Sequence, residues 1–217
     1  MFASCETASF WHDNWTGLGP LIHVTGANGP LTVGLPLNAV VRDALRGRDC
    51  SVWFKDRVPK HAFICWVVAW NRLHTRDRLR SWGLNTPSVC VLCNGADETH
   101  DHLFFQCHFS GQVWSFFTRR AGLTPPPQLM ASLLWLKTAS TSKNLSLIIK
   151  LLFQASVYLI WRERNLRIHS SNFRNPPQII KEIQLLVRAR LDPLSRSQST
   201  APLGSSLLVT WFALFQD

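Results

Sequence analysis

The chain has 217 residues, of which 46% are hydrophobic and 17% are charged. This composition excludes a disordered protein and is sufficient for a sizeable buried core, in one domain with appendages or in two small domains. The formal net charge of +10 at pH 7 favours a polyanion or an anionic membrane surface as the partner. The basic excess is concentrated in the later part of the chain, between residues 142 and 191.

The cysteines and the first residues of the chain indicate the cellular compartment in which the protein is expected. The six cysteines are Cys5, Cys50, Cys65, Cys90, Cys93 and Cys107. The opening MFASCETASFWHDNW has neither the positive segment nor the apolar segment of a secretory signal. We therefore expect reduced thiols and an intracellular protein that is not secreted. No compact basic run of the nuclear-import type decides between nucleus and cytoplasm.

Residues 1–50 are rich in glycine and proline, which interrupt every periodic run. They predict an irregular flank with short strands. The segment LNAVVRDALRG is the exception, and it predicts a short helix that ends at Gly47.

Two short helices are predicted after Ser51. Pro59 suits the first turn of a helix, and apolar residues then recur at helical spacing, namely Phe63, Trp66, Val67, Trp70 and Leu73. Thr75 is the predicted N-cap of a second helix, RDRLRSW, which Gly83 ends. Together the two segments predict an αα-hairpin.

Further helices are predicted beyond the cysteine-rich segment, so the expected fold class is mainly α. They cover FSGQVWSFFTRRAGL, residues 128–137, residues 142–169 and a segment that starts at Pro176 or Pro177. Pro125, Pro126 and Pro127 form the strongest internal break. The expected regions are an irregular flank at 1–50, a domain that contains the cysteine-rich segment at 51–122, a basic helical region at 123–192, and a linker with an apolar tail at 193–217. For the tail, SLLVTWFALFQD, a strand is expected.

The longest apolar stretch is LSLIIKLLFQASVYLIW, within the predicted helix 142–169. Lys150 and Gln154 interrupt it, and it is short for a membrane span. A buried helix is the preferred interpretation and a membrane segment the alternative, so we do not expect a membrane partner.

A metal site is predicted between Cys90 and Cys107. Cys90 and Cys93 place two thiolates on one tight turn, and His102 with Cys107 supplies a second pair, in the pattern C-x2-C-x8-H-x4-C. Soft and borderline ligands of this kind suit zinc, and four protein ligands predict a closed, structural site. His100 and His108 compete with His102, and spacing alone does not decide between them. A redox CxxC would need a strand–CxxC–helix setting that this segment lacks.

Two carboxylates, Glu98 and Asp101, lie inside the same segment. They could suggest acid–base chemistry, but no other feature supports a catalytic pair. We interpret them as solvated carboxylates near a cationic metal.

The run VWFKDRVPKHAFICWVVAWNRLHTRDRLRSWGLNTPSVCVLCNGADETHDHLFFQCHFSGQVWSFF contains a dense set of motifs. They are Trp53, Val58-Pro59-Lys60, Trp66, Leu73-His74-Thr75-Arg76-Asp77-Arg78-Leu79, Trp82-Gly83, Cys90, Cys93, Glu98-Thr99, His102-Leu103-Phe104, Cys107 and Val113-Trp114. This pattern, over about residues 52–117, resembles the zinc-binding domain after the polymerase in reverse transcriptases of plant non-LTR (LINE-type) retrotransposons. The flanks SFWHDNWTGLGPL and YLIWRERNLRIH share the resemblance.

The resemblance implies that His102, which precedes Leu-Phe, is the histidine ligand. It also shows two departures. The Gly/Pro-rich flank and the domain almost abut at Cys50-Ser51, where relatives have a longer stretch, so the flank is expected to pack differently. No Tyr-x-Asp-Asp motif is present, since the single tyrosine, Tyr158, precedes Leu-Ile-Trp. Two-metal nucleotidyl transfer needs paired carboxylates, so we do not expect an enzyme.

Two hypotheses of function follow. The first is a zinc-stabilised, non-catalytic module that binds RNA or DNA through phosphate contacts, with aromatic side chains available to stack on unpaired bases. Its candidate contacts are Arg76, Arg78, Arg80, Lys150, Arg162, Arg164 and Arg167. The alternative is a protein-interaction or purely structural module, with a polymerase domain in trans as a candidate partner. An exposed Trp or Phe favours the first hypothesis, and an exposed apolar patch favours the second.

Overall fold

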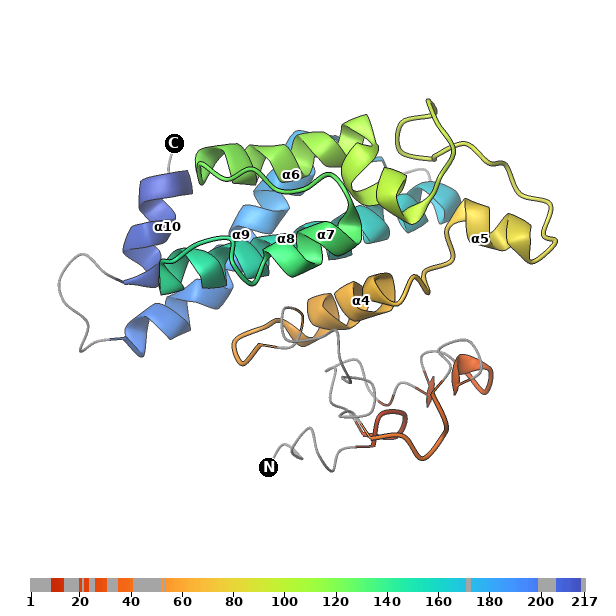
Figure 1. Cartoon of the computed structure of the whole chain (residues 1–217), viewed down its shortest axis with the longest axis horizontal. Helices are drawn as coiled ribbons and strands as arrows, with labels where there is room; N and C mark the ends of the chain where they lie inside the picture. The colour runs from red at the N-terminus through yellow and green to blue at the C-terminus, as the bar shows by residue number, and fades with distance from the viewer. Residues whose placement is uncertain are drawn as a thin grey trace. The chain divides into compact units, whose positions relative to one another are not determined.

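The computed structural model describes residues 9–13, 20, 22–23, 26–30, 35–40, 52, 54–170, 173–198 and 206–215. The chain divides into two compact units, Met1–Arg72 and Leu73–Asp217. Within the described residues the fold is mainly α, as predicted (Figure 1). The only β pairing among these residues is in two isolated bridges.

The first unit contains helix α4, Pro59–Ala69, which begins at the predicted proline. Trp66 is 1% exposed and contacts Phe10, with ring centroids 5.1 Å apart. An isolated bridge pairs Ser9 with Val40, in keeping with the expected irregular flank. The helix predicted to end at Gly47 lies mostly outside the described residues.

The second unit begins with helix α5, Arg76–Ser81. Gly83 has a φ of +80° and ends the helix, as predicted, because glycine adopts this left-handed conformation without strain. Thr75 occupies the N-cap position, but its side chain caps no N–H. Since α4 and α5 belong to different units, the predicted hairpin does not form one compact unit.

The core of the second unit is built around helix α8, Lys143–His169. The helices α6 (His108–Arg120), α9 (Pro176–Arg196) and α10 (Leu207–Phe215) all contact it. α8 has the length and composition to cross a membrane, yet 61% of its apolar window is buried inside the structure. This burial favours the preferred interpretation as a core helix.

The apolar tail forms helix α10, so the expected strand is wrong. Leu207, Trp211 and Phe215 are spaced four residues apart and are all buried, and the Phe215 ring lies 5.8 Å from that of Phe117 on α6. The run is apolar at almost every position, so its sequence has no period that separates helix from strand. The contacts with α6, α8 and α9 decide the conformation.

The linker predicted from residue 193 begins later, because α9 continues through Pro193 to Arg196. Pro193 lies in the last turn of the helix, and Ser197 N donates to its carbonyl oxygen at 3.2 Å. The Arg196 guanidinium also pairs with Asp192 at 2.7 Å. These local contacts extend the helix beyond a residue that usually ends one.

The predicted break at Pro125, Pro126 and Pro127 lies between α6 and α7, and both helices belong to the second unit. Ser132 of α7, Leu129–Trp135, donates its hydroxyl to Pro126 O at 2.8 Å. The Asp101 carboxylate accepts a hydrogen bond from Leu129 N at 2.9 Å and so caps the start of α7. The predicted boundary at residue 122 therefore lies inside the second unit.

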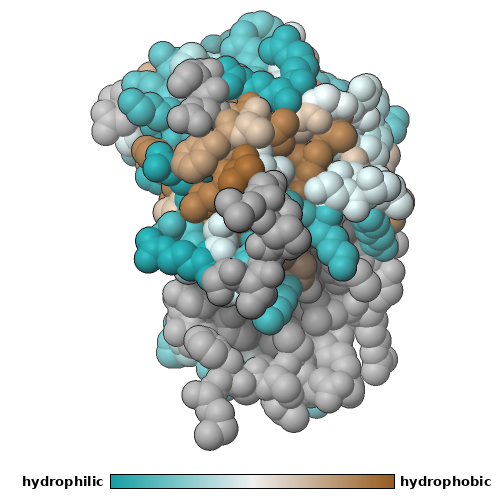
Figure 2. Space-filling model, turned by 90° about the vertical axis from the view of Figure 1, so that its left-hand side faces the viewer, coloured by the Kyte–Doolittle hydropathy of each residue, from teal (hydrophilic) through white to brown (hydrophobic). Residues whose placement is uncertain are grey.

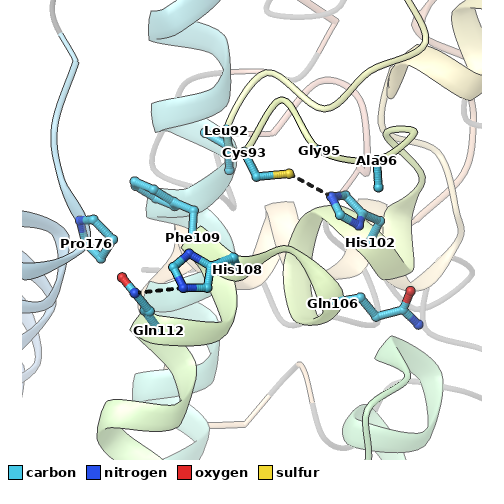
Figure 3. A pocket seen from close by; sticks show the side chains of 10 residues that line it. All are labelled: Leu92, Cys93, Gly95, Ala96, His102, Gln106, His108, Phe109, Gln112 and Pro176. Carbon is cyan, nitrogen blue, oxygen red and sulfur yellow. Dashed lines mark hydrogen bonds between the residues drawn. The ribbon is translucent and has the colours of Figure 1, made fainter.

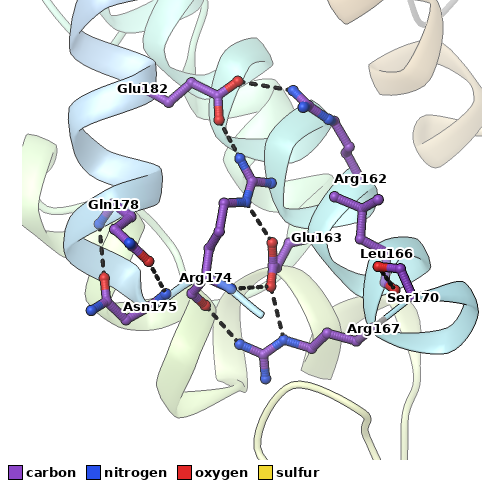
Figure 4. A network of polar contacts seen from close by, with 9 residues as sticks. All are labelled: Arg162, Glu163, Leu166, Arg167, Ser170, Arg174, Asn175, Gln178 and Glu182. Atoms are coloured by element: carbon purple, nitrogen blue, oxygen red, sulfur yellow. Dashed lines mark hydrogen bonds and ion pairs between the residues drawn. The ribbon is translucent and has the colours of Figure 1, made fainter. Parts of the chain in front are cut away.

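An ionic network closes the corner between α8 and α9 (Figure 4). The buried Glu163 carboxylate accepts from Arg167 Nε at 3.0 Å and from Arg174 Nε at 2.7 Å. Glu182 on α9 pairs with Arg174 and, at 2.8 Å, with Arg162. Arg174 therefore links the carboxylates of the two helices.

The Glu163 network predicts a pH-dependent contribution to stability. Burial acts to raise the pKa of Glu163, but the N–H groups of Arg174 and Arg167 outweigh burial and hold it below 4.5. This contribution is therefore present above about pH 4.5 and is lost as pH falls through the folded-state pKa. We expect Glu163→Gln to lower the free energy of unfolding at pH 7 by about 3 kcal/mol, and to lower it less at pH 3.

Urea unfolding of the two proteins at both pH values measures this difference. Glu182→Gln is the matched control, because its side chain is 31% exposed and its loss should cost about 1 kcal/mol or less. An equal loss for Glu163→Gln at both pH values would contradict the assignment.

Candidate metal centre

The structure brings the side chains of Cys90, Cys93, His102 and Cys107 together, with their ligand atoms all within 4.8 Å of one another. The Cys90 and Cys107 sulfur atoms are 4.0 Å apart, and Cys93 Sγ lies 3.3 Å from His102 Nε2 (Figure 3). Around a tetrahedral zinc ion, S–S distances of about 3.8 Å and S–N distances of about 3.5 Å follow from ordinary bond lengths. The cluster is suited to zinc in both donor type and spacing.

A tight turn positions the first two cysteines. Asn94 N donates to Cys90 O at 2.9 Å, and Cys90 N donates to Ala96 O at 2.7 Å. Asn94 has a φ of +52°, a left-handed conformation that asparagine tolerates better than most residues. Beyond the turn, the bridge between Val89 and Asp97 closes the loop.

In the second ligand pair, His102 is the first residue of a single turn of π-helix, η1, His102–Gln106, and Cys107 directly follows that turn. Cys107 N donates to His102 O at 2.7 Å, and Cys107 is also the N-cap residue of α6. The N-terminus of a helix stabilises negative charge, so this position favours a thiolate. The turn of π-helix thus holds His102 and Cys107 on the same side of the chain.

The thiols of the buried pair have unequal acidity. The Cys90 thiol donates toward the Cys107 sulfur, which raises the pKa of Cys90 and lowers the pKa of Cys107. Burial opposes the lowering at Cys107, whereas the N–H groups of Ser110 and Phe109 add to it. Burial lowers the pKa of His102, so its imidazole is neutral at pH 7, which is the form that binds a metal. Zinc binding would displace the remaining thiol protons.

The structure separates His102 from its two competitors. His100 is 7% exposed, and its Nδ1 atom lies 3.3 Å from the Thr75 hydroxyl, outside the cluster. His108 is exposed and its Nε2 atom is 3.2 Å from the side-chain nitrogen of Gln112. Spacing left this choice open, and the side-chain geometry selects His102 as the histidine of the cluster.

The cluster has a buried side and an open side. Cys90 and Cys107 are 0% exposed, whereas Cys93 and His102 are half-buried and line a cavity of about 680 Å³ (Figure 3). The cavity is also lined by Gln106, His108, Phe109 and Gln112. Since the protein supplies all four donors, the site fits a closed, structural metal and leaves no donor position for water.

The interpretation of Glu98 as a solvated carboxylate is wrong, because its side chain is 0% exposed. Its Oε1 atom accepts from Arg164 Nη2 at 2.7 Å, from Arg164 Nε at 3.1 Å and from Arg76 N at 3.0 Å. Glu98 thus connects the metal loop to α5 and to α8. The only sequence signal for this role was its place in the Glu-Thr motif, since a partner 66 residues away leaves no local pattern.

Arg164 and Arg167, two of the candidate nucleic-acid contacts, make contacts inside the fold. Arg164 has a side chain that is 5% exposed, and the Glu98 pair occupies its guanidinium. Arg167 donates to Leu92 O in the metal loop at 3.1 Å and lies 4.7 Å from the centroid of the Phe109 ring. Both side chains support the fold. The sequence placed them on the long basic helix but could not show these distant partners.

The other candidate cations differ in exposure, and only Arg80 and Arg162 are exposed. Arg162 has a side chain that is 46% exposed and pairs with Glu182, while Lys150 is half-buried. Arg76, Arg78 and Arg80 are all on α5, next to Trp82, which is 49% exposed. Of the predicted cations, only these three lie together on one short helix.

Comparison with known proteins bears directly on the metal. Residues 43–114 match the family model described as zinc-binding in reverse transcriptase. The match spans about a third of the chain and contains the whole four-residue cluster. This reverse transcriptase zinc-binding family and the cluster agree on zinc as the cofactor. No curated protein and no solved structure matches the chain.

Proposed function

We propose that this chain is a zinc-stabilised module that binds nucleic acid without catalysis, derived from the reverse transcriptase of a plant non-LTR retrotransposon. The observation that supports binding is helix α5, which carries Arg76, Arg78 and Arg80 and is followed directly by the half-exposed Trp82, whose ring centroid lies 5.0 Å from the Arg78 guanidinium. Arginine forks pair with phosphate oxygens, and the basic net charge of the chain favours a polyanion.

The metal loop anchors this surface. Arg76 N donates to the Glu98 carboxylate at 3.0 Å, and Asp77 N donates to Glu98 O at 3.2 Å. Glu98 lies between the two ligand pairs, Cys90 with Cys93 and His102 with Cys107. A bound zinc ion would therefore hold the residue that fixes the first turn of α5, and metal loss would loosen the binding surface.

The proposed role is non-catalytic because the sequence contains no Tyr-x-Asp-Asp motif, and the metal-binding cluster among the described residues contains no carboxylate for a two-metal site. The origin in a plant non-LTR element rests on the motifs around the cysteines and on the Trp161-Arg162-Glu163-Arg164-Asn165 run of α8.

Salt-dependent binding tests the proposal. We expect the zinc-loaded chain to bind labelled RNA or DNA in fluorescence anisotropy, with an affinity that falls as salt rises from about 50 to 200 mM. Arg76→Gln with Arg80→Gln should weaken binding and reduce the slope of log K against log salt by roughly 0.7 to 0.9 per lost phosphate contact. Arg119→Gln, an exposed arginine on α6, is the matched control. Absence of binding to any oligonucleotide would contradict the proposal.

A second candidate function is protein interaction. Figure 2 shows apolar side chains gathered on one face, at the end of the second unit where α10 lies. Every residue of α10 except Thr210 is apolar, and Val209 is 48% exposed. A polymerase domain acting in trans is a candidate partner for this face. Sedimentation of the chain mixed with such a domain, for wild type and Val209→Asp, distinguishes this function from nucleic-acid binding.

A further inference from the structure

Trp82 is the most exposed tryptophan among the residues that the structure describes, at 49%. Trp66, Trp114 and Trp211 are each between 1% and 5% exposed. Tryptophan has the largest apolar surface to bury, so a half-exposed indole on a short helix is a costly arrangement for folding alone. The exposed part of its surface is available to a partner.

The indole is held in place by its neighbours. The Arg78 guanidinium lies 5.0 Å from the Trp82 ring centroid, within cation–π range. The His74 ring contacts Trp82 edge-on, with ring centroids 5.4 Å apart. Leu84 N also donates to Leu79 O at 3.1 Å, which fixes the chain beyond the helix. A ring fixed in this way loses little conformational entropy when a partner binds.

Two further cations, Arg76 and Arg80, belong to the same six-residue helix as Arg78. The Arg80 guanidinium donates one N–H to Thr86 O at 3.2 Å, and that of Arg76 donates one to Val89 O. Each guanidinium has five N–H donors, so these bonds orient the side chain and leave donors for an anion. Asp77 is the only acid on α5, and it lies in the first turn, where a carboxylate favours the helix dipole.

We infer that Trp82 stacks on an unpaired base and that Arg76, Arg78 and Arg80 contact the adjacent phosphates, so the preferred ligand is single-stranded nucleic acid. This inference rests on the proposed function and narrows it. An aromatic platform beside cations recognises the π-face of a base together with its backbone, whereas a duplex hides its base faces within the stack. Base stacking and phosphate contacts would recognise single strands of RNA and of DNA alike.

The test measures binding of zinc-loaded full-length chain to matched labelled oligonucleotides: single-stranded RNA, single-stranded DNA and the DNA duplex. We expect tighter binding to single strands than to the duplex. Trp82→Ala should weaken single-strand binding about 5- to 100-fold and leave duplex binding unchanged, and Trp82→Phe should recover most of the loss. Leu134→Ala, a 59% exposed apolar residue on α7, is the control that should change neither.

The outcomes separate the two proposals. If no oligonucleotide binds, the proposed function itself fails. If oligonucleotides bind but Trp82→Ala has no effect on single strands, or the duplex is preferred, the base-stacking inference is overturned while the proposed function stands. Zinc content and helicity of each variant, expected to equal those of wild type, exclude unfolding as the cause of weaker binding. A preference for RNA over DNA with the same Trp82 dependence supports the inference and adds recognition of the 2′-hydroxyl.

Discussion

Replacing Cys90 and Cys93 together by serine is expected to abolish zinc binding and to unfold the metal loop with the adjacent α5. The wild-type chain should contain one zinc per molecule by elemental analysis, and the double variant none. Loss of metal should be accompanied by a loss of helicity in circular dichroism. A folded wild-type chain without zinc would refute the assignment of the site.

The expected effect is large because little else holds this part of the chain together. α5 has six residues and η1 has five, and helices of this length are not stable by themselves. Structural zinc sites contribute about 10 kcal/mol or more of apparent binding free energy, which is comparable to the whole stability of a typical domain. Removing two of the three thiolates therefore removes the main local stabilisation.

The matched control is Cys65→Ala. Cys65 is a buried cysteine of α4 that lies outside the four-residue cluster. Burial raises the pKa of its thiol, as expected for an inert core cysteine rather than a metal ligand. The variant should keep one zinc per chain. Its free energy of unfolding should fall only by the small amount that follows from removing one buried sulfur atom from the core.

Breaking the buried pair between Glu98 and Arg164 should have the second-largest effect. The two side chains are 0% and 5% exposed, so removing one partner leaves a buried charge without its counter-ion. Glu98→Gln and Arg164→Met should each lower the free energy of unfolding by about 3–5 kcal/mol. Chemical denaturation of the zinc-loaded proteins measures the loss.

The double variant Glu98→Gln with Arg164→Met distinguishes the loss of this ion pair from general damage to the core. When both charges are removed, no unpaired ion remains, so the combined loss should be clearly smaller than the sum of the single losses. Arg162→Met on the same helix is the control, because its pair with Glu182 is partly exposed and should contribute about 1 kcal/mol or less. Additive losses for Glu98→Gln and Arg164→Met would show that the pair is not coupled.

The metal cluster could be predicted from the sequence because its residues lie within eighteen positions of one another. The two ligand pairs form turns of fixed geometry, and the spacing between them needs only one loop to close. The choice of His102 over His100 was different. Spacing left it open, and the Thr75 hydroxyl, 25 residues earlier, contacts His100.

Helix ends were determined by the sequence alone wherever a neighbouring residue caps the unpaired N–H or C=O groups at the end of the helix. Ser142 accepts from Leu145 N at the start of α8, and Asn175 with Gln178 forms a capping box at the start of α9. Gly83 and Gly122 have positive φ values beyond the ends of α5 and α6. These signals act within four residues, so no tertiary contact is needed to predict them.

Only the tertiary structure decided what the charged residues and the tail do. Arg164 and Arg167 share with Arg76 and Arg80 a place on a helix with polar neighbours, yet the first two contact groups 66 and 75 residues away. The tail is apolar throughout, and it is a helix because α6, α8 and α9 bury one side of it. The physical reason is common to both cases. Capping and ligand spacing act over a few residues, whereas burial and ion pairing depend on which distant segments meet.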